Sequence, residues 1–416
     1  MENDIYNSVG RIEARKKNLE PFNNGKCAIE FLDKMLLMGL SPIRVASIAF
    51  HVLSILRIKD DIEVKNWIKS DVESVIREFQ KKDWKSETRE RFVFVLKRFV
   101  SYAKQEIIVE KKNDEDYSPE VAWLHPKKYR RKNDDSILEN RKGFSEPEIL
   151  KILSIIPDVS ISYDRDYLFI IVGYEAGLRV AELILLKLKD IEFDQKNNIA
   201  YIIVKSGKSS ARKIPLIISF RKLADFIANH PLKTNPESYL FYSKHAKDNR
   251  ISYNYAVELI RKACDKASLP RKNLYKLRHS RITNLLLSRT PLPIVQKISG
   301  HKRLETVRTY SSIIQSDVID AVMIDRGLKP EKNNDDEKIH VKKCIACNRV
   351  EDPTAIRCSA CGSFLDISTA LKFGQARESY SHKNDKKTRK EIEELRDMIL
   401  QQQKMIQEFI SNQQKN

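Results

Sequence analysis

The sequence predicts a mainly α-helical fold with one small antiparallel β-sheet. Apolar residues recur at spacings of three and four along most of the chain, which is the period of an amphipathic helix. One β-rich run, residues 199–204, is followed by a polar turn and a second run that ends at Leu216. The 416 residues are 41% hydrophobic and 32% charged, which is enough apolar content for packed cores. At roughly 150 residues per domain, this length predicts two or three domains.

Residues 1–106 are predicted to form a small helical bundle. One helical run stops at Gly39, and Ser41 and Pro42 then supply an N-cap and a proline for the first turn of the next helix. A later helix is indicated by apolar residues at spacings of three and four, namely Phe92, Val95, Leu96, Phe99 and Val100. Basic residues on that helix, Lys97 among them, are expected to face solvent.

Residues 107–142 are predicted to form a mobile polar linker. Residues 110–116 are all charged or Asn, and a basic cluster follows. The cluster consists of Lys127, Lys128, Arg130, Arg131 and Lys132. A segment this polar is expected to bury little surface. Its basic residues would either follow a line of phosphates or act as a soluble hinge, and the composition favours neither.

Residues 143–325 are predicted to form a second, mixed α/β domain. Ser145 and Glu148 form a capping box before an apolar run, which indicates the start of a helix. Two buried helical stretches are expected to follow. Residues 191–216 should contain the antiparallel strands, and residues 221–325 are expected to be helical again.

The charge balance predicts a polyanionic partner. Lys and Arg number 76 against 57 Asp and Glu, so the formal net charge is +19. Nucleic acid is the first expectation and an anionic membrane surface is the second. No apolar stretch approaches the ~20 residues of a membrane helix, and the polar start of the chain lacks a signal-peptide layout. A secreted or membrane protein is therefore not expected.

Four short segments of the second domain occur together in a fixed order. They are Ala176-Gly-Leu-Arg179-Val-Ala-Glu182, Val204-Lys205-Ser-Gly-Lys208, Tyr275-Lys-Leu-Arg278-His279, and Gly300-His301 with Tyr310 nine residues later. This order and spacing resemble the tyrosine recombinase (phage integrase) family. The resemblance covers about residues 143–325 and implies a tyrosine recombinase catalytic domain there. Residues 1–106 resemble the family's DNA-clamping core-binding domain more weakly, through helix pattern alone.

The resemblance implies transesterification at a DNA phosphodiester. Tyr310 would attack the scissile phosphorus and form a 3′-phosphotyrosyl link. Arg179 and Arg278 offer forked cationic donors that suit the charge of the transition state, and His301 is expected to donate a further hydrogen bond. Glu182 is expected to brace the turn at Arg179, because a carboxylate beside the phosphate would repel it.

A lysine on the β-hairpin is implied as the general acid for the leaving 5′-oxygen. Lys205 ends the first strand and is favoured, while Lys208 nearer the turn is the alternative. The covalent intermediate stores the bond energy, so neither ATP nor a catalytic metal is expected.

Tyr275 departs from the family pattern, which has His-x-x-Arg where this chain has Tyr-x-x-Arg. In this respect the chain resembles the archaeal plasmid and virus integrase subgroup. A tyrosine, with an ordinary pKa of ~10, donates a hydrogen bond well but is a poor base near pH 7. We therefore expect Tyr275 to be a neutral donor in the active site.

Four of the six cysteines fall in a short segment near the C-terminus. Cys344 and Cys347 form one Cys-x-x-Cys pair, and Cys358 and Cys361 form another. Two such pairs predict a closed tetrahedral site for a structural zinc in a zinc-ribbon-like module over residues 340–365. A redox dithiol pair is the alternative.

Beyond this module, residues 385–416 are predicted to form an amphipathic helix or a short coiled coil. The apolar positions follow a heptad pattern for less than three heptads.

The leading interpretation is a site-specific DNA recombinase or integrase that acts on double-stranded DNA, as a homo-tetramer on paired sites. We expect it in a prokaryotic cytoplasm, associated with the nucleoid and a mobile element. A type IB topoisomerase-like enzyme is a second interpretation. A non-catalytic, zinc-containing DNA-binding protein is the third, and the complete set of Arg, His and Tyr residues argues against it.

Overall fold

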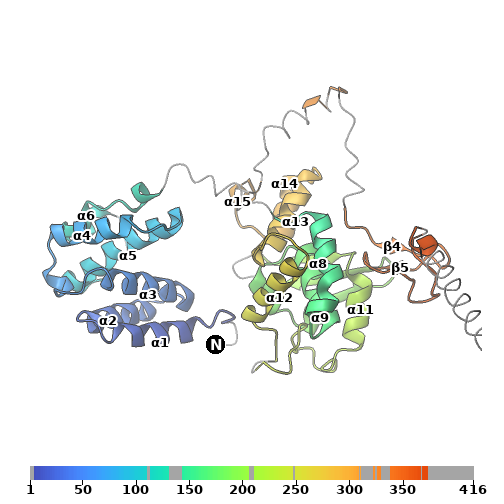
Figure 1. Ribbon diagram of the computed structural model, residues 1–416, viewed down its shortest axis with the longest axis horizontal. Helices are drawn as coiled ribbons and strands as arrows, with labels where there is room; N and C mark the ends of the chain where they lie inside the picture. Colours follow the sequence, from blue (N-terminus) through green and yellow to red (C-terminus); the bar gives the residue numbers. More distant parts are fainter. Residues whose placement is uncertain are drawn as a thin grey trace, which may run out of the picture.

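The computed structural model describes residues 4–109, 113–130, 143–205, 210–246, 249–308, 310, 322–323, 326–328, 338–366 and 368–372. Within these ranges the chain is mainly helical, with short antiparallel strands, as the sequence predicts. Figure 1 shows a helical lobe made from the first part of the chain and a second lobe that contains the sheet. None of the helices described here is long and apolar enough to cross a membrane.

The first lobe is a bundle built around the apolar helix α3. Its helices are α1 (Ser8–Leu19), α2 (Gly25–Leu37), α3 (Pro42–Leu56), α4 (Lys69–Gln80) and α5 (Ser86–Gln105), with the short turn η1 (Val64–Asn66) before α4. Pro42 occupies the first turn of α3, as predicted. Aromatic rings of α4 and α5 stack in the core, with the Phe79 and Phe92 centroids 4.1 Å apart.

The prediction of a mobile linker from residue 107 is wrong for its first half. Residues 113–129 form η2 (Asp114–Asp116), α6 (Pro119–Ala122) and η3 (Pro126–Tyr129). The apolar residues between the charges enter the bundle core, namely Ile108, Val109, Tyr117, Val121 and Leu124. A few apolar side chains that pack into the bundle core are enough to fix a mostly polar segment. Residues 131–142 lie outside the described residues.

The expectation that Lys97 faces solvent is also wrong. Its side chain is buried, and Nζ donates to the carbonyl oxygens of Ala122 (3.0 Å) and Leu124 (3.1 Å). Nζ also lies 4.3 Å from the centroid of the Tyr117 ring. This buried ammonium group therefore fixes the 113–129 segment on α5.

The second lobe begins with α8 (Glu146–Val159), where Ser145 and Glu148 form the predicted capping box. The next elements are α9 (Tyr163–Glu175), α10 (Val180–Ile184) and η4 (Leu188–Asp190). Strands β1 (Ile191–Asp194), β2 (Ile199–Val204) and β3 (Arg212–Leu216) form one antiparallel sheet in that order. The register of β2 and β3 pairs Val204 with Arg212, so the two strand ends that flank the hairpin turn lie opposite each other.

Five further helices of this lobe lie within the described residues. They are α11 (Phe220–Ala228), α12 (Tyr253–Lys266), α13 (Tyr275–Leu287), α14 (Leu292–Ser299) and α15 (Leu304–Arg308). The α9 helix is buried along nearly its whole length and forms the centre of the core. Its last residue, Glu175, accepts hydrogen bonds from the backbone N–H groups of residues 217–219 and from the Ser219 hydroxyl. These bonds fix the segment between β3 and α11 to the end of α9.

Segments before α1 and after α15 pack on the second lobe. Ile5, before α1, belongs to its apolar core, and the Tyr6 and Tyr253 rings are 4.9 Å apart. Ile339 enters the same core from the C-terminal side. The cysteine-rich module follows, with strands β4 (Lys342–Lys343) and β5 (Val350–Glu351).

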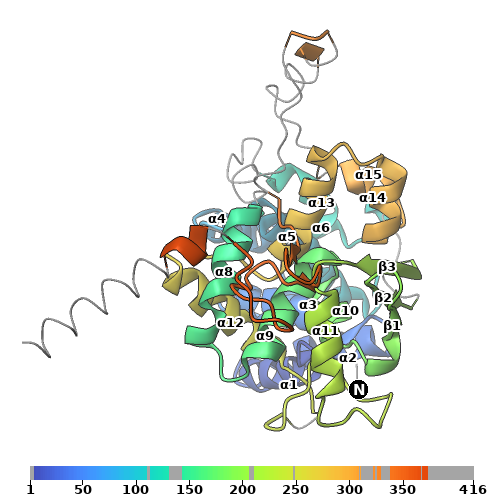
Figure 2. The ribbon, with the colours of Figure 1, turned by 90° about the vertical axis from the view of Figure 1, so that its right-hand side faces the viewer.

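Figure 2 shows this module in front of α9 and α11. The Tyr167 hydroxyl on α9 donates to Asp352 Oδ1 at 3.1 Å. The helix predicted over residues 385–416 lies outside the described residues.

Candidate active site

Arg179 stands at the N-cap position of α10, directly after the turn that ends α9. The Glu182 carboxylate accepts the Arg179 backbone N–H (2.9 Å) and also its Nη1 (3.4 Å). This is the bracing contact that the sequence predicts for Glu182. The guanidinium group remains partly exposed, so Arg179 is held by its backbone while its side chain can still reach a ligand.

Arg278 on α13 is 1% exposed and lies beside the same turn. Its Nη1 donates to the Gly177 carbonyl and its Nη2 to the Ser299 carbonyl, each at 2.7 Å. The buried Nε has no hydrogen-bond partner among the described residues. An unused donor on a buried cation is costly unless a ligand completes it. This spare N–H makes Arg278 a candidate for binding an anionic oxygen.

His301 does not have the arrangement expected of a residue that donates a hydrogen bond to the phosphate. Its Nε2 is 3.1 Å from Nη2 of Arg278, and its Nδ1 is 2.8 Å from the Ser299 hydroxyl. A guanidinium group can only donate, so Nε2 must accept and the proton must lie on Nδ1. Burial, followed by the charges of Arg278 and Arg179, lowers the pKa of His301 to about 4. In this arrangement a neutral His301 orients Arg278.

Tyr310 is 8% exposed and lies against this group. Its hydroxyl is hydrogen bonded to the hydroxyl of Tyr275, the first residue of α13. Its ring centroid is 4.9 Å from that of His279 and 5.5 Å from that of His301. Burial, followed by the bond to Tyr275, raises the pKa of Tyr310 above its ordinary value. The tyrosine is therefore protonated near pH 7 and must lose its proton to act as a nucleophile.

The structure brings together five of the six predicted catalytic residues, namely Arg179, Tyr275, Arg278, His301 and Tyr310. Lys205, the sixth, is exposed at the end of β2, where the hairpin turn begins. Its alternative, Lys208, lies outside the described residues.

Sequence reasoning missed two residues that contact this group. His279 packs on Tyr310, and Arg212 on β3 pairs with Glu182 at 2.9 Å. A signal for Arg212 was present in the sequence. It occupies an inward position of β3, in alternation with Ile214 and Leu216, where an apolar residue is the rule.

The four cysteines of the C-terminal module form a site that fits a zinc ion. Their Sγ atoms all lie within 4.8 Å of one another, and the closest pairs are 3.5 Å apart. Zn–S bonds of ~2.3 Å in a tetrahedron separate the sulfur atoms by roughly 3.8 Å, while a disulfide requires ~2.05 Å. The spacing thus matches metal ligation and not disulfide bonding.

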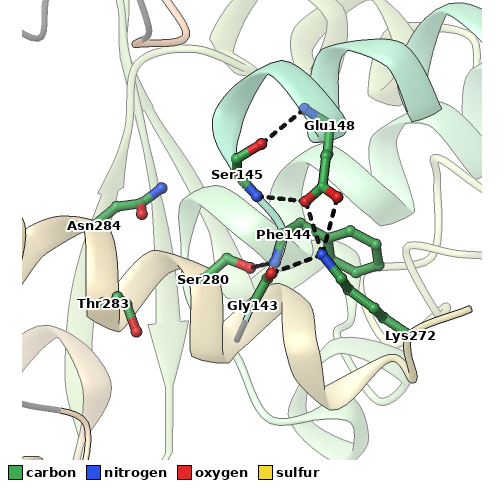
Figure 3. A pocket seen from close by; sticks show the side chains of 8 residues that line it. All are labelled: Gly143, Phe144, Ser145, Glu148, Lys272, Ser280, Thr283 and Asn284. Carbon is green, nitrogen blue, oxygen red and sulfur yellow. Dashed lines mark hydrogen bonds and ion pairs between the residues drawn. The ribbon is translucent and has the colours of Figure 1, made fainter. Parts of the chain in front are cut away.

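A cavity of about 400 Å³ lies beside α13, where the second lobe begins, and is lined in part by Ser280, Thr283 and Asn284 of that helix. Figure 3 shows Lys272 reaching both Glu148 and the Gly143 carbonyl there. A Cβ atom on Gly143 would lie 2.5 Å from the Ser280 hydroxyl, so only glycine fits this close approach. None of the predicted catalytic residues lines the cavity, which is the joint where the incoming chain is fixed to α13.

Solved structures with a similar fold are DNA recombinases. The XerH site-specific recombinase in a post-cleavage complex with palindromic difH substrate has a TM-score of 0.53 and 18% identity, over 78% of this chain and 97% of that chain. The Tn1549 transposon integrase in complex with transposon right end DNA has a TM-score of 0.54 and 16% identity, over 73% and 99%. At these identities the comparison shows the fold.

Sequence comparisons agree with the fold. A tyrosine recombinase of Pseudothermotoga lettingae is 28% identical over 270 residues, which cover 64% of this chain and 85% of that protein. Tyrosine recombinase XerA of Pyrococcus horikoshii is 29% identical over 184 residues, which cover 44% of this chain and 60% of XerA. A sequence profile of the phage integrase family matches residues 142–315. The fold and the matched domain define a tyrosine-type site-specific recombinase. Residues 142–315 therefore form a domain of the phage integrase family.

Proposed function

We propose that this protein cleaves and rejoins double-stranded DNA at specific sites through a covalent bond between Tyr310 and a 3′-phosphate. The observation that carries the proposal is the convergence of a buried tyrosine hydroxyl with two arginines, one of which keeps an unused buried N–H. A phosphodiester in front of Tyr310 would supply the acceptor oxygens for that N–H and for Arg179. Two cationic forks stabilise the charge that builds on the non-bridging oxygens in the transition state.

In the cleavage step, the Tyr310 oxygen bonds to phosphorus as the bond from phosphorus to the 5′-oxygen breaks. The Tyr310 proton passes to water, while the neutral Tyr275 hydroxyl, which contacts the Tyr310 oxygen and is 45% exposed, donates a hydrogen bond to that oxygen as its negative charge develops. A hairpin lysine, Lys205 by preference and Lys208 otherwise, protonates the departing 5′-oxygen. Attack of a 5′-hydroxyl on the phosphotyrosyl bond reverses the step, so neither ATP nor a catalytic metal is required.

The two lobes have different roles on DNA. The helical bundle, extended to residue 129, serves as the DNA-clamping core-binding domain, and residues 143–325 form the catalytic domain. The net charge of +19 supports a long DNA contact. Recombination requires four strand cleavages, which one active site per chain supplies in a tetramer on paired sites. The protein would act on nucleoid DNA in the cytoplasm.

The cysteine module serves as a structural zinc site. Four thiolates close the coordination shell, so the metal has no open position for chemistry. A module this small gains its stability from the metal.

The test is covalent capture of DNA. The protein is incubated with sheared genomic DNA of its source organism, denatured, and the fragments that remain attached are sequenced to find the site. A nicked substrate built on that site should then trap an adduct through its 3′-phosphate. Strand exchange between two duplexes distinguishes a recombinase from a topoisomerase-like enzyme, which only relaxes one duplex. The absence of any adduct would overturn the proposal.

A further inference from the structure

Arg212 is a buried cation at the edge of the active site. It begins β3, and its side chain is 2% exposed. A buried charge of this kind is retained only where partners compensate its desolvation. The partners of Arg212 come from three separate parts of the active site.

The first partner is Glu182 on α10. Nη2 of Arg212 is 2.9 Å from Oε2 of Glu182, and Nη1 is 3.4 Å from Oε1. The same carboxylate holds the backbone and side chain of Arg179. One negative charge is thus shared by two arginines, which leaves an excess positive charge on this side of the site. If Arg212 were absent, the Glu182 carboxylate would be more available to Arg179 and would offset more of its charge.

The other partners are the lysine hairpin and the turn that carries His301. Nε of Arg212 donates to the Ile298 carbonyl at 2.9 Å, and Nη1 lies 3.4 Å from the Ser210 carbonyl. The Ser210 N–H in turn donates to the Gly300 carbonyl at 3.3 Å. Arg212 therefore connects the returning arm of the hairpin to the end of α14.

The contact with Arg212 requires a glycine at residue 300. Its φ of +69° lies in the left-handed region, and a Cβ atom there would be 2.6 Å from Nη1 of Arg212. The guanidinium group, held by Glu182 and Ile298, thus occupies the space that a side chain at residue 300 would need. The turn before His301 packs directly on Arg212.

We propose that Arg212 is a positioning residue for DNA cleavage. It pairs with the Glu182 carboxylate, so that Arg179 stays available to the scissile phosphate. It also holds the turn before His301 against the lysine hairpin. This inference rests on the proposed function. Arg212 touches neither the phosphate nor Tyr310 in this scheme and acts through Arg179 and His301.

The test compares single-turnover cleavage and DNA binding in four variants. Arg212→Met should slow cleavage by roughly 10- to 100-fold, the scale expected when catalytic groups are displaced by about 1 Å, with an unchanged Kd for DNA. Arg212→Lys keeps the pair with Glu182 but not the forked contacts, and should recover part of the rate. Lys213→Met is the matched control, because Lys213 is the next residue on the strand and pairs with Glu192 on the outer face. It should cleave as the wild type does.

Gly300→Ala supplies the fourth variant, since it displaces the guanidinium without removing its charge. It should slow cleavage in the wild-type background and cost less in the Arg212→Met background, where the conflict with the guanidinium group is gone and the backbone strain at this φ remains. Fully additive losses in the double variant would contradict the contact.

A DNA-free readout separates this proposal from the proposed function. Arg278, Arg179 and Arg212 all lower the pKa of His301, and Glu182 raises it. Arg212→Met should therefore raise the His301 pKa in an imidazole NMR titration, whether or not any DNA is cleaved. If the wild type and Lys213→Met cleave and Arg212→Met cleaves equally fast, the positioning role is wrong while the function stands. Equal loss of folding, binding and cleavage in both Arg212 variants would reduce Arg212 to a structural residue and also overturn the proposal. If the wild type itself fails to cleave, the proposed function fails instead.

Discussion

His51 in the helical bundle and His301 in the catalytic domain are both buried, and the pKa of each is lowered to about 4. Burial is the largest cause in both, followed by nearby arginines: Arg91 and Arg15 for His51, and Arg278 and Arg179 for His301. Their neighbours differ. The His51 ring packs among aromatic rings of the bundle core, 6.1 Å from Trp84 and 6.2 Å from Phe92. The His301 ring uses both nitrogens and lies against Tyr310.

The buried cations of the two lobes show the same contrast. Lys97 and Arg278 are 2% and 1% exposed. Lys97 is directed at two carbonyls and an aromatic ring within its own lobe. Arg278 keeps an unused N–H next to a tyrosine hydroxyl. Burial and a shifted pKa therefore do not by themselves indicate a functional site. The distinguishing feature is the convergence of groups from separate elements, because an unsatisfied buried nitrogen also occurs in the bundle, at His51.

The largest effect is expected at the nucleophile. Tyr310→Phe removes only the attacking oxygen, so it should form no covalent adduct and bind DNA with nearly unchanged affinity. Tyr117→Phe is the matched control, because Tyr117 is buried to a similar extent in the bundle core. It should form the adduct at the wild-type rate. The readout is a denaturing gel with labelled nicked DNA, and an adduct in Tyr310→Phe would remove this residue from the reaction.

The two buried cations should separate activity from stability. Arg278→Met should lower single-turnover cleavage by roughly 10²- to 10³-fold, since loss of one transition-state donor costs about 2.7–4 kcal/mol. Lys97→Met should instead lower the free energy of unfolding by about 1–3 kcal/mol, because it removes the ammonium donor from the buried Leu124 carbonyl and the part-buried Ala122 carbonyl. The folded Lys97→Met protein should cleave normally. Chemical denaturation and cleavage kinetics measure the two effects, and the reverse pattern would contradict the comparison.

A smaller effect is expected at Tyr275. Tyr275→Phe keeps the ring and removes the hydroxyl that contacts Tyr310. Cleavage should slow by roughly 10- to 100-fold, which is the scale of a supporting donor, and the acidic limb of the pH–rate profile should persist. Complete loss of activity together with that limb would make Tyr275 an essential base. An unchanged rate would make it a packing residue.

The two histidines should each reduce stability in mild acid. Their folded-state pKa of about 4 lies below the ordinary 6.5, so the unfolded chain binds protons first as the pH falls. The free energy of unfolding should therefore fall between pH 6.5 and pH 4, by about 2 kcal/mol per histidine at pH 5. His51→Leu should reduce this loss without changing cleavage. Urea denaturation at pH 7 and pH 5 measures it, and an identical pH dependence in the variant would contradict the shifted pKa.

The smallest effect on cleavage is expected for the cysteine module. Native mass spectrometry should find one zinc per chain, which Cys344→Ser should lose. The fragment 1–330 contains every proposed catalytic residue and should still cleave. It should also be less stable, because it lacks Ile339 in the core and the Asp352 partner of Tyr167. If this fragment is folded but inactive, the module takes part in the active assembly.

Features that depend on neighbours in the sequence could be predicted directly. The capping box at Ser145 forms between residues three apart, and the local helical and strand periods predicted the strands of 191–216 and the helices described up to residue 308, although residues 229–246 and 249–252 are not helical as expected. The Cys-x-x-Cys pairs fix their own geometry in the same way. The order of the Arg, Lys, Tyr and His segments indicated the recombinase family. The structure brings together five of the six predicted catalytic side chains, all except Lys205.

Other features were decided only by tertiary packing. The composition of residues 107–129 predicts a linker because most of them are polar. The few apolar residues among them nevertheless pack into the bundle core. The contact of Arg212 with Glu182 joins residues 30 apart, and that of Tyr167 with Asp352 joins residues 185 apart. Whether His301 accepts or donates depends on where the guanidinium of Arg278 lies. The sequence by itself determined which chemical groups are present and which local elements carry them. Packing determined which of those groups meet, because burial and hydrogen bonding between distant residues exist only once the elements have docked.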